Sequence, residues 1–338
     1  MSRTVIGYLA RIADFDSQPY DVELIEHSNW GNGDYVIGQI TGPENDLYNI
    51  ETRTGEMLPV VAGDKVIGAL GRRAGTLQGV GDYLSVKNGH LDALTNAGLF
   101  GAYTSLSQLL SKPISLLYRG HIVRHGRKVQ MSDFAVRNKA RKFTVPTILI
   151  IGTSMSAGKT VSGTLACKIL VASGLKVAGA KLTGAGRYRD ILSFQRAGAS
   201  QIYDFVDAGL PSTIVPEMEF RAAIRPLLGL IDEHQPDVMV AEAGASPLEP
   251  YNGAALMDEL GDAIRCIVLA AFDPYSVVGV QQAFGVTPDL VTGPATSTTA
   301  ACALVDKLTG IQSINVLDPA SVPAFRDLLA EKLDRELR

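Results

Sequence analysis

The sequence predicts an α/β fold in which a smaller, β-rich (α+β) N-terminal domain precedes a C-terminal domain with a mostly parallel sheet flanked by helices. Up to about residue 135, short alternating segments are separated by turn residues, which is typical of β-rich structure. From Pro146 onward, apolar runs of strand length alternate with helical stretches, which indicates a parallel sheet with helices on both faces. We expect domains at 1–135 and 147–338, joined by a basic linker at 136–146.

The N-terminal domain is expected to consist mainly of strands and hairpins. Single strands are expected at 35–40 and 65–70. Two hairpins are expected, one formed by 47–52 and 56–61 around Thr54-Gly55, the other by 114–118 and 121–123 around Arg119-Gly120. One or two helices are expected between these strands, around 90–96 and 103–110.

The C-terminal domain is expected to alternate strands with helices. Its predicted strands are 148–151, 176–180, 238–241, 266–270 and 314–317. Its predicted helices are 159–173, 189–199, 219–234, 253–262, 277–285, 296–309 and, as an amphipathic closing helix, 322–337.

Composition excludes several functional classes. The 338 residues are 46% hydrophobic and 20% charged, with a net charge of −4, so the basic footprint of a nucleic-acid binder is missing. No apolar run approaches the ~18 residues of a membrane span, and no signal-peptide core precedes Arg11. The cysteines, at 167, 266 and 302, lack metal-ligand spacing. We therefore expect a cytoplasmic protein with a small-molecule substrate and neither nucleic-acid nor membrane partners.

One loop carries a strong functional signal. Gly152-Thr-Ser-Met-Ser-Ala-Gly158-Lys159-Thr160 follows a predicted strand and begins a predicted helix, which is the context of a phosphate-binding P-loop, although five residues rather than four separate the glycines. Lys159 is expected to reach the β- and γ-phosphates of ATP and Thr160 to bind Mg²⁺. The expected cofactor-binding residues are Gly152, Thr153, Ser156, Ala157, Gly158, Lys159, Thr160 and Val161.

Three charged residues near other strand ends are further candidates. Ligands of open α/β sheets bind at the carboxyl ends of strands, where Lys181 and Glu242 fall. A carboxylate at the edge of a buried strand is costly without a partner, which favours a functional role for Glu242. Lys181 could equally be a surface lysine, and Asp190 could simply be a helix N-terminal residue favoured by the dipole.

The loop resembles that of dethiobiotin synthetase and of related cobyric-acid-synthase-type ATPases. Three more stretches are similar to those families, namely Lys181-Leu-Thr-Gly, Asp190-Ile-Leu-Ser-Phe-Gln-Arg196 and Ala241-Glu-Ala-Gly-Ala245. The resemblance implies that Thr160, Asp190 and Glu242 surround magnesium and that Lys159 and Lys181 are catalytic. It implies an ATP-dependent, ligase- or kinase-like enzyme that activates a carboxylate, carbamate or amine by phosphoryl transfer, as a homodimer or higher homo-oligomer.

Two alternatives remain open. The two-domain layout and the stretch from Glu242 to Gly253 are similar to a P-loop family, formerly of unknown function, that includes D-glutamate N-acetyltransferase. That resemblance implies an acyl-CoA-dependent amino-acid N-acetyltransferase, whose loop would hold the phosphates of acetyl-CoA. The other alternative is a P-loop ATPase switch or metallochaperone, although no clustered cysteines or histidines are visible. Adenine is preferred over guanine because no Asn-Lys-x-Asp-type motif appears.

Overall fold

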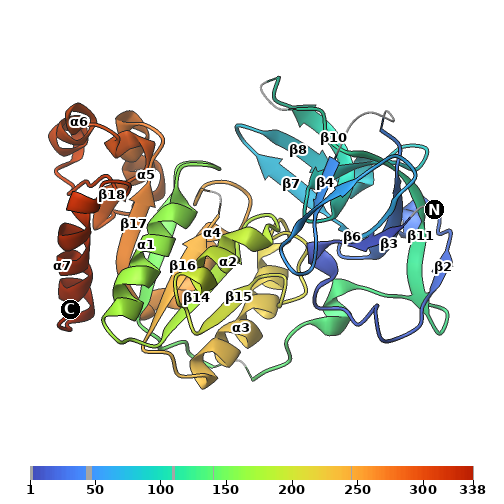
Figure 1. Cartoon of the computed structure of the whole chain (residues 1–338), viewed down its shortest axis with the longest axis horizontal. Coiled ribbons are helices and arrows are strands. Elements are labelled where there is room, and N and C mark those ends of the chain that lie inside the picture. The colour runs from blue at the N-terminus through green and yellow to red at the C-terminus, as the bar shows by residue number, and fades with distance from the viewer. Residues whose placement is uncertain (1–2, 43–47, 109–110, 140, 245, 338) are drawn as a thin grey trace. The chain divides into compact units, whose positions relative to one another are not determined.

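The computed structural model of the protein describes residues 3–42, 48–108, 111–139, 141–244 and 246–337. The chain forms two compact units, and most of their helices and strands are labelled in Figure 1. Unit 1 comprises Met1–Arg137, Ala185–Arg189 and Phe205–Ile214. Unit 2 comprises Asn138–Gly184, Asp190–Asp204 and Val215–Arg338. Two short segments from the C-terminal half of the sequence therefore belong to unit 1.

Unit 1 is built around a large, mostly antiparallel sheet. Its strands are β1 (Thr4–Ile6), β2 (Asp21–Glu23), β3 (Tyr35–Ile40), β4 (Tyr48–Glu51), β5 (Met57–Val60), β6 (Lys65–Leu70), β7 (Arg72–Gly75), β8 (Gly79–Asp82), β9 (His90–Thr95), β10 (Leu99–Leu106), β11 (Ser115–Arg124) and β12 (Arg127–Lys128). The sheet runs in the order β1-β6-β3-β11-β9-β10-β8-β7, with β2 and β12 paired to β11 and β4–β5 as a separate hairpin. Its core is apolar and includes Val36, Val66, Phe100 and Leu116.

Two expectations for unit 1 are wrong. The segments 90–96 and 103–110 belong to strands β9 and β10 rather than helices, and residues 109–110 lie outside the described residues. In β9, Leu91 and Ala93 are buried and Asp92 between them is half-buried. This alternation with a period of two residues is typical of a strand, although leucine and alanine favour helices. Arg119-Gly120 is no turn, because β11 passes through it with a register shift between Tyr118 and Gly120. The first expected hairpin is confirmed by the pairing of β4 with β5.

Unit 2 contains a parallel sheet flanked by helices, as the sequence predicts. Its strands are β13 (Thr147–Gly152), β14 (Val177–Thr183), β15 (Gln201–Asp204), β16 (Val238–Ala243), β17 (Ile264–Ala270) and β18 (Leu290–Thr292). Its helices are α1 (Lys159–Ala172), α2 (Tyr188–Arg196, whose first two residues lie in unit 1), α3 (Glu217–Glu233), α4 (Gly253–Leu260), α5 (Pro274–Phe284), α6 (Thr299–Thr309) and α7 (Val322–Leu333). The sheet order is β15-β14-β16-β13-β17-β18, and each pair of neighbouring strands is parallel.

The helices of unit 2 pack on the sheet through apolar side chains. Helix α1 packs on β13 and β16, and α7 packs on β17. Phe194 of α2 fills the space over Gly163 and Gly179, where an added Cβ would come within 2.8 and 2.6 Å of its ring or Cβ. Glycine at both positions lets α1, α2 and β14 approach closely. This packing holds α2 against the N-terminal halves of α1 and β14.

Some strand assignments for unit 2 need correction. The expected strand at 314–317 is not formed, and its neighbourhood contributes one parallel bridge, between Val291 and Ser313. The edge strand β15 was not expected, because its sequence Gln-Ile-Tyr-Asp is short and has polar ends. Within the described part of the chain, no helix is both long and apolar enough to cross a membrane.

Candidate phosphate-binding site

The candidate site lies at the carboxyl edge of the parallel sheet. Strand β13 ends at Gly152 between β16 and β17, and α1 begins at Lys159. Glu242 is the register partner of both Ile150 on β13 and Lys181 on β14. Because parallel strands end at a common edge, the loop, Glu242 and Lys181 come together there, as the sequence predicts for ligand-binding residues.

The backbone of the loop is curled at defined positions. Ser156 and Gly158 have φ values of +64° and +103°, in the left-handed region that glycine tolerates best. An added Cβ at Gly152 would lie 2.9 Å from Nζ of Lys159, so glycine lets the lysine fold back over the end of β13. A strand, a curled glycine-bounded loop and a helix in a parallel sheet together form a P-loop domain.

Lys159 is a buried cation whose ammonium faces the inside of the loop. Its Nζ donates a 2.8 Å hydrogen bond to the carbonyl oxygen of Ser154, and the residue is 6% exposed. Burial lowers the pKa of Lys159, and the carboxylate of Glu242 opposes this shift. Lowered solvation strengthens the attraction of such a cation for anionic oxygens.

Thr160 and Glu242 are joined directly. The Thr160 hydroxyl donates to Oε2 of Glu242 at 2.9 Å, and Glu242 is 3% exposed. Burial raises the pKa of Glu242, with a further contribution from Asp190 and opposition from Lys181 and Lys159. A hydroxyl beside a carboxylate supplies the hard oxygen donors that Mg²⁺ prefers, so these two predicted metal ligands fit the ion.

Asp190, the third predicted metal ligand, is paired with a lysine. Nζ of Lys181 lies 2.6 Å from Oδ2 of Asp190, and both side chains are largely buried. Burial lowers the pKa of Lys181, but the carboxylates of Asp190 and Glu242, among others, raise it overall, so this lysine stays charged. Among the described residues, no three His, Cys, Asp or Glu side chains form a metal-binding group. The structure therefore gathers the predicted charged residues at one edge of the sheet, and the role of Asp190 as a magnesium ligand stays a prediction.

The remaining loop residues occupy different environments. The hydroxyl of Thr153 accepts a 3.1 Å hydrogen bond from the amide of Phe272, Ala157 is buried, and Val161 is 45% exposed on α1. Sequence reasoning missed Ser162, whose hydroxyl lies 2.8 Å from that of Thr292 and ties α1 to β18. Its signal was a hydroxyl residue two positions after the motif. Ala245, in the stretch after Glu242, lies outside the described residues.

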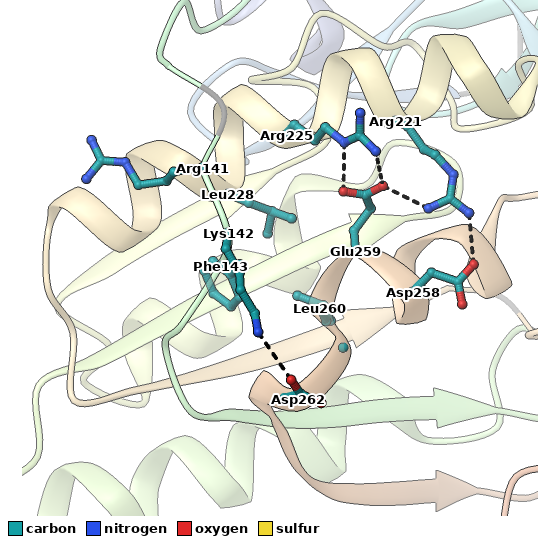
Figure 2. Close-up of a pocket in the computed structure, with 11 residues that line it drawn as sticks. Arg141, Lys142, Phe143, Arg221, Arg225, Leu228, Asp258, Glu259, Leu260 and Asp262 are labelled. Carbon is teal, nitrogen blue, oxygen red and sulfur yellow. Dashed lines mark hydrogen bonds and ion pairs between the residues drawn. The ribbon is translucent and has the colours of Figure 1, made fainter.

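A surface hollow of about 730 Å³ lies elsewhere on unit 2 (Figure 2). It is lined by Arg141–Phe143, by residues of α3 and by the segment from Asp258 to Asp262. These linings immediately precede β13 and β17, so the hollow lies at the amino edge of the sheet, opposite the phosphate loop. Several of its charges are paired with one another, for example Arg225 with Glu259 at 2.8 Å. We assign it no role in the site.

Comparisons with known proteins give only distant structural likenesses. No protein-family model and no curated protein matches the sequence. The chain is similar to chloroplast FtsY from Physcomitrella patens, with 15% identity, a TM-score of 0.37 and coverage of 58% of this chain and 68% of that chain. It is also similar to HypB from Helicobacter pylori in complex with nickel, with 16% identity, a TM-score of 0.37 and coverage of 56% and 87%.

A third similar structure is the 54 kDa signal recognition particle protein from Aeropyrum pernix in complex with GDP, with 18% identity, a TM-score of 0.35 and coverage of 60% and 53%. Likenesses of this size do not assign an activity. The structures named here include no dethiobiotin synthetase, and that resemblance remains a prediction from the sequence motifs. The assignment of a P-loop domain rests on the geometry of the loop and the order of the parallel strands.

Proposed function

We propose that unit 2 binds a magnesium–nucleoside triphosphate and cleaves its terminal phosphoanhydride bond. The observation that carries the proposal is the 2.9 Å hydrogen bond between Thr160 and the buried Glu242. In P-loop proteins, the hydroxyl that follows the lysine and an acidic residue at a neighbouring strand end hold the magnesium ion.

Each residue of the site has a role in this proposal. The loop amides and Lys159 bind the β- and γ-phosphates, since curled backbone N–H groups and a helix N-terminus attract anions. Thr160 and Glu242 hold Mg²⁺, which neutralises charge on the phosphates when bound. Lys181, kept charged by Asp190, faces the same edge and stabilises negative charge that develops on the transferred group.

Water is the acceptor in our leading proposal, which makes the protein a nucleotide-driven P-loop switch. A second candidate is transfer to a small metabolite, as the resemblance to dethiobiotin synthetase implies. The buried Lys181–Asp190 pair favours it, because a second cation beside the phosphate loop suits an anionic acceptor such as a carboxylate or carbamate.

Binding measurements on the full chain test the proposal. Calorimetric titrations with ATP, GTP and acetyl-CoA, each with Mg²⁺ and with EDTA, should show Mg²⁺-dependent binding of a triphosphate. Lys159→Ala should weaken that binding by roughly 100-fold, because a buried charge-assisted contact is lost. Lys142→Ala is the matched control, since Lys142 is 79% exposed and lines the hollow at the amino edge of the sheet.

Two results would overturn the proposal. Binding of acetyl-CoA in EDTA, with no binding of either triphosphate, would favour the acyltransferase alternative. Equal triphosphate binding by Lys159→Ala and wild type would place the nucleotide elsewhere. Phosphate release without an added metabolite would indicate the switch, because the metabolite-activating enzyme should cleave the triphosphate only when its acceptor is supplied.

A further inference from the structure

The segment 185–189 leaves the parallel sheet after β14 and belongs to unit 1. Gly186 lies against Leu9, where an added Cβ would come within 2.6 Å of the leucine side chain. Ala185 forms a bridge with Ser212, from the other short segment of unit 1. The stretch of chain that leads directly into helix α2 therefore packs as part of unit 1.

Glu51, the last residue of β4, binds the first turn of α2. Its Oε2 accepts a hydrogen bond from the amide of Tyr188 and its Oε1 one from the amide of Arg189, each at 2.9 Å. Glu51 is only 2% exposed. The first amides of a helix have no partner within the helix and carry the positive end of its dipole, so a buried carboxylate that accepts from two of them fixes the helix start.

Aromatic and cationic contacts hold the same turn. The rings of Tyr8 and Tyr188 stack with centroids 4.5 Å apart and an angle of 12° between their planes. The guanidinium of Arg11 lies 5.3 and 5.4 Å from these two rings and is paired with Asp207 at 2.6 Å. These residues belong to unit 1, so the position of Tyr188 and Arg189 is set within that unit.

The next residue along the chain is Asp190, which binds Lys181 at 2.6 Å. Lys181 is the register partner of Glu242, which in turn accepts from Thr160. Arg189, whose amide binds Glu51, is therefore the immediate neighbour of Asp190, whose carboxylate pairs with Lys181.

We infer that Glu51 is a positioning residue for phosphoryl transfer. By fixing the first turn of α2, it sets the place of Asp190 and thereby the ammonium of Lys181 at the phosphate edge. The inference rests on the proposed function, because it assigns Lys181 to the transferred group.

The test compares Glu51→Gln with Asp64→Asn in the full chain. Glutamine keeps one acceptor oxygen but turns an NH₂ group toward the second amide. Asp64 is the matched control because it is also a buried carboxylate of unit 1 that accepts from two amides, those of Arg3 and Val61, yet it does not touch α2. Thermal unfolding establishes that both variants are folded.

Glu51→Gln should lower kcat for triphosphate cleavage by roughly 10-fold, the effect of losing a partner that orients an active-site group, with little change in nucleotide Kd. Asp64→Asn should leave both unchanged. In a double-mutant cycle, adding Asp190→Asn should cause little further loss in the Glu51→Gln background, because both act through Lys181. Amide hydrogen exchange should rise at 188–192 in Glu51→Gln alone.

Each outcome bears on the inference. Unchanged exchange at 188–192 in Glu51→Gln would overturn it, whether or not the protein cleaves a nucleotide. Faster exchange with unchanged kcat would show that Glu51 only caps the helix and would also overturn the inference. Fully additive effects of Glu51→Gln and Asp190→Asn would have the same meaning. If the wild type binds no nucleotide, the proposed function fails, and the exchange result still shows whether Glu51 holds the turn.

Discussion

Asp34 in unit 1 and Glu242 in unit 2 are both buried carboxylates, but they have opposite surroundings. Asp34 is 0% exposed. Its carboxylate lies 3.2 Å from the His121 ring and 2.6 Å from Nζ of Lys128. It also accepts hydrogen bonds from the side-chain amide of Gln130 at 2.6 Å and the backbone amide of Gly31 at 2.7 Å. Burial alone would raise its pKa, but these donors together lower it. The Asp34 carboxylate is therefore an anion with several hydrogen-bond donors, and it links strands that are distant in the sequence.

Glu242 is the contrasting case. It accepts from Thr160, and two lysines lie near it, yet burial and the neighbouring Asp190 raise its pKa. The ionised form of Glu242 is therefore disfavoured in the folded protein, whereas that of Asp34 is favoured. Burial alone therefore does not identify a functional carboxylate. A buried carboxyl group whose pKa is raised, as that of Glu242 is, is a candidate because a bound cation would stabilise its ionised form.

The largest expected effect is on unit 1. Asp34→Asn should lower the free energy of unfolding by about 2–4 kcal/mol, because Lys128 and His121 lose a buried anionic partner. The single tryptophan, Trp30, is buried with its ring 5.6 Å from that of His121, so its fluorescence during denaturant unfolding reports on this region. A loss below about 0.5 kcal/mol would contradict the description of Asp34 as a structural anchor.

The pH dependence of the stability of Asp34→Asn provides a second test of the contrast between Asp34 and Glu242. The folded pKa of Asp34 lies below its ordinary value of 3.8, so the carboxylate stabilises the protein above that pH and loses this contribution as the pH falls through the folded pKa. The stability difference between wild type and Asp34→Asn should be constant from pH 7 to about pH 4.5 and then shrink by up to about 1.4 kcal/mol per pH unit. A difference that widens in acid would refute the assignment.

The smallest expected effect has the opposite sign. The raised pKa of Glu242 means that ionisation costs stability as the pH rises through the folded pKa, so Glu242→Gln should stabilise unit 2 at neutral pH by about 0.5–2 kcal/mol, the usual gain from relieving a strained functional site. Far-ultraviolet circular dichroism follows unit 2, which contains nearly all the helices. The variant should also lose Mg²⁺-dependent nucleotide binding. Destabilisation like that of Asp34→Asn would show that the lysines saturate Glu242.

Sequence reasoning succeeded where the chemistry is local in the chain. The strand, loop and helix around Lys159 are contiguous, and Lys181 and Glu242 could be placed because parallel strands end at one edge. It failed where partners are distant in sequence. Asp34 meets His121, and Glu51 meets Tyr188, across 87 and 137 positions respectively.

The wrong predictions of secondary structure also arise from contacts between residues that are distant in the sequence. Strand β9 contains Leu91, Ala93 and Leu94, residues that favour helices in isolation, and pairing with β10 and β11 overrides that preference. Gly120 looked like a turn, but its φ of +140° lies at an irregularity inside β11, with Val22 of β2 beside it. A glycine inside an apolar run can mark a bulge as readily as a turn.

The division of unit 1 into three stretches of chain has a consequence for biosynthesis. Residues up to Arg137 emerge from the ribosome first. The stretches 185–189 and 205–214 that complete the unit follow only after two and three strands of the parallel sheet, respectively, have been made. At about 5–20 residues per second, the first stretch waits several seconds for the others. A fragment cut at Arg137 should therefore expose Tyr8 and Leu9, which Tyr188 and Gly186 contact in the full chain. We expect the two halves of the sequence to fold as an interdependent pair rather than in succession.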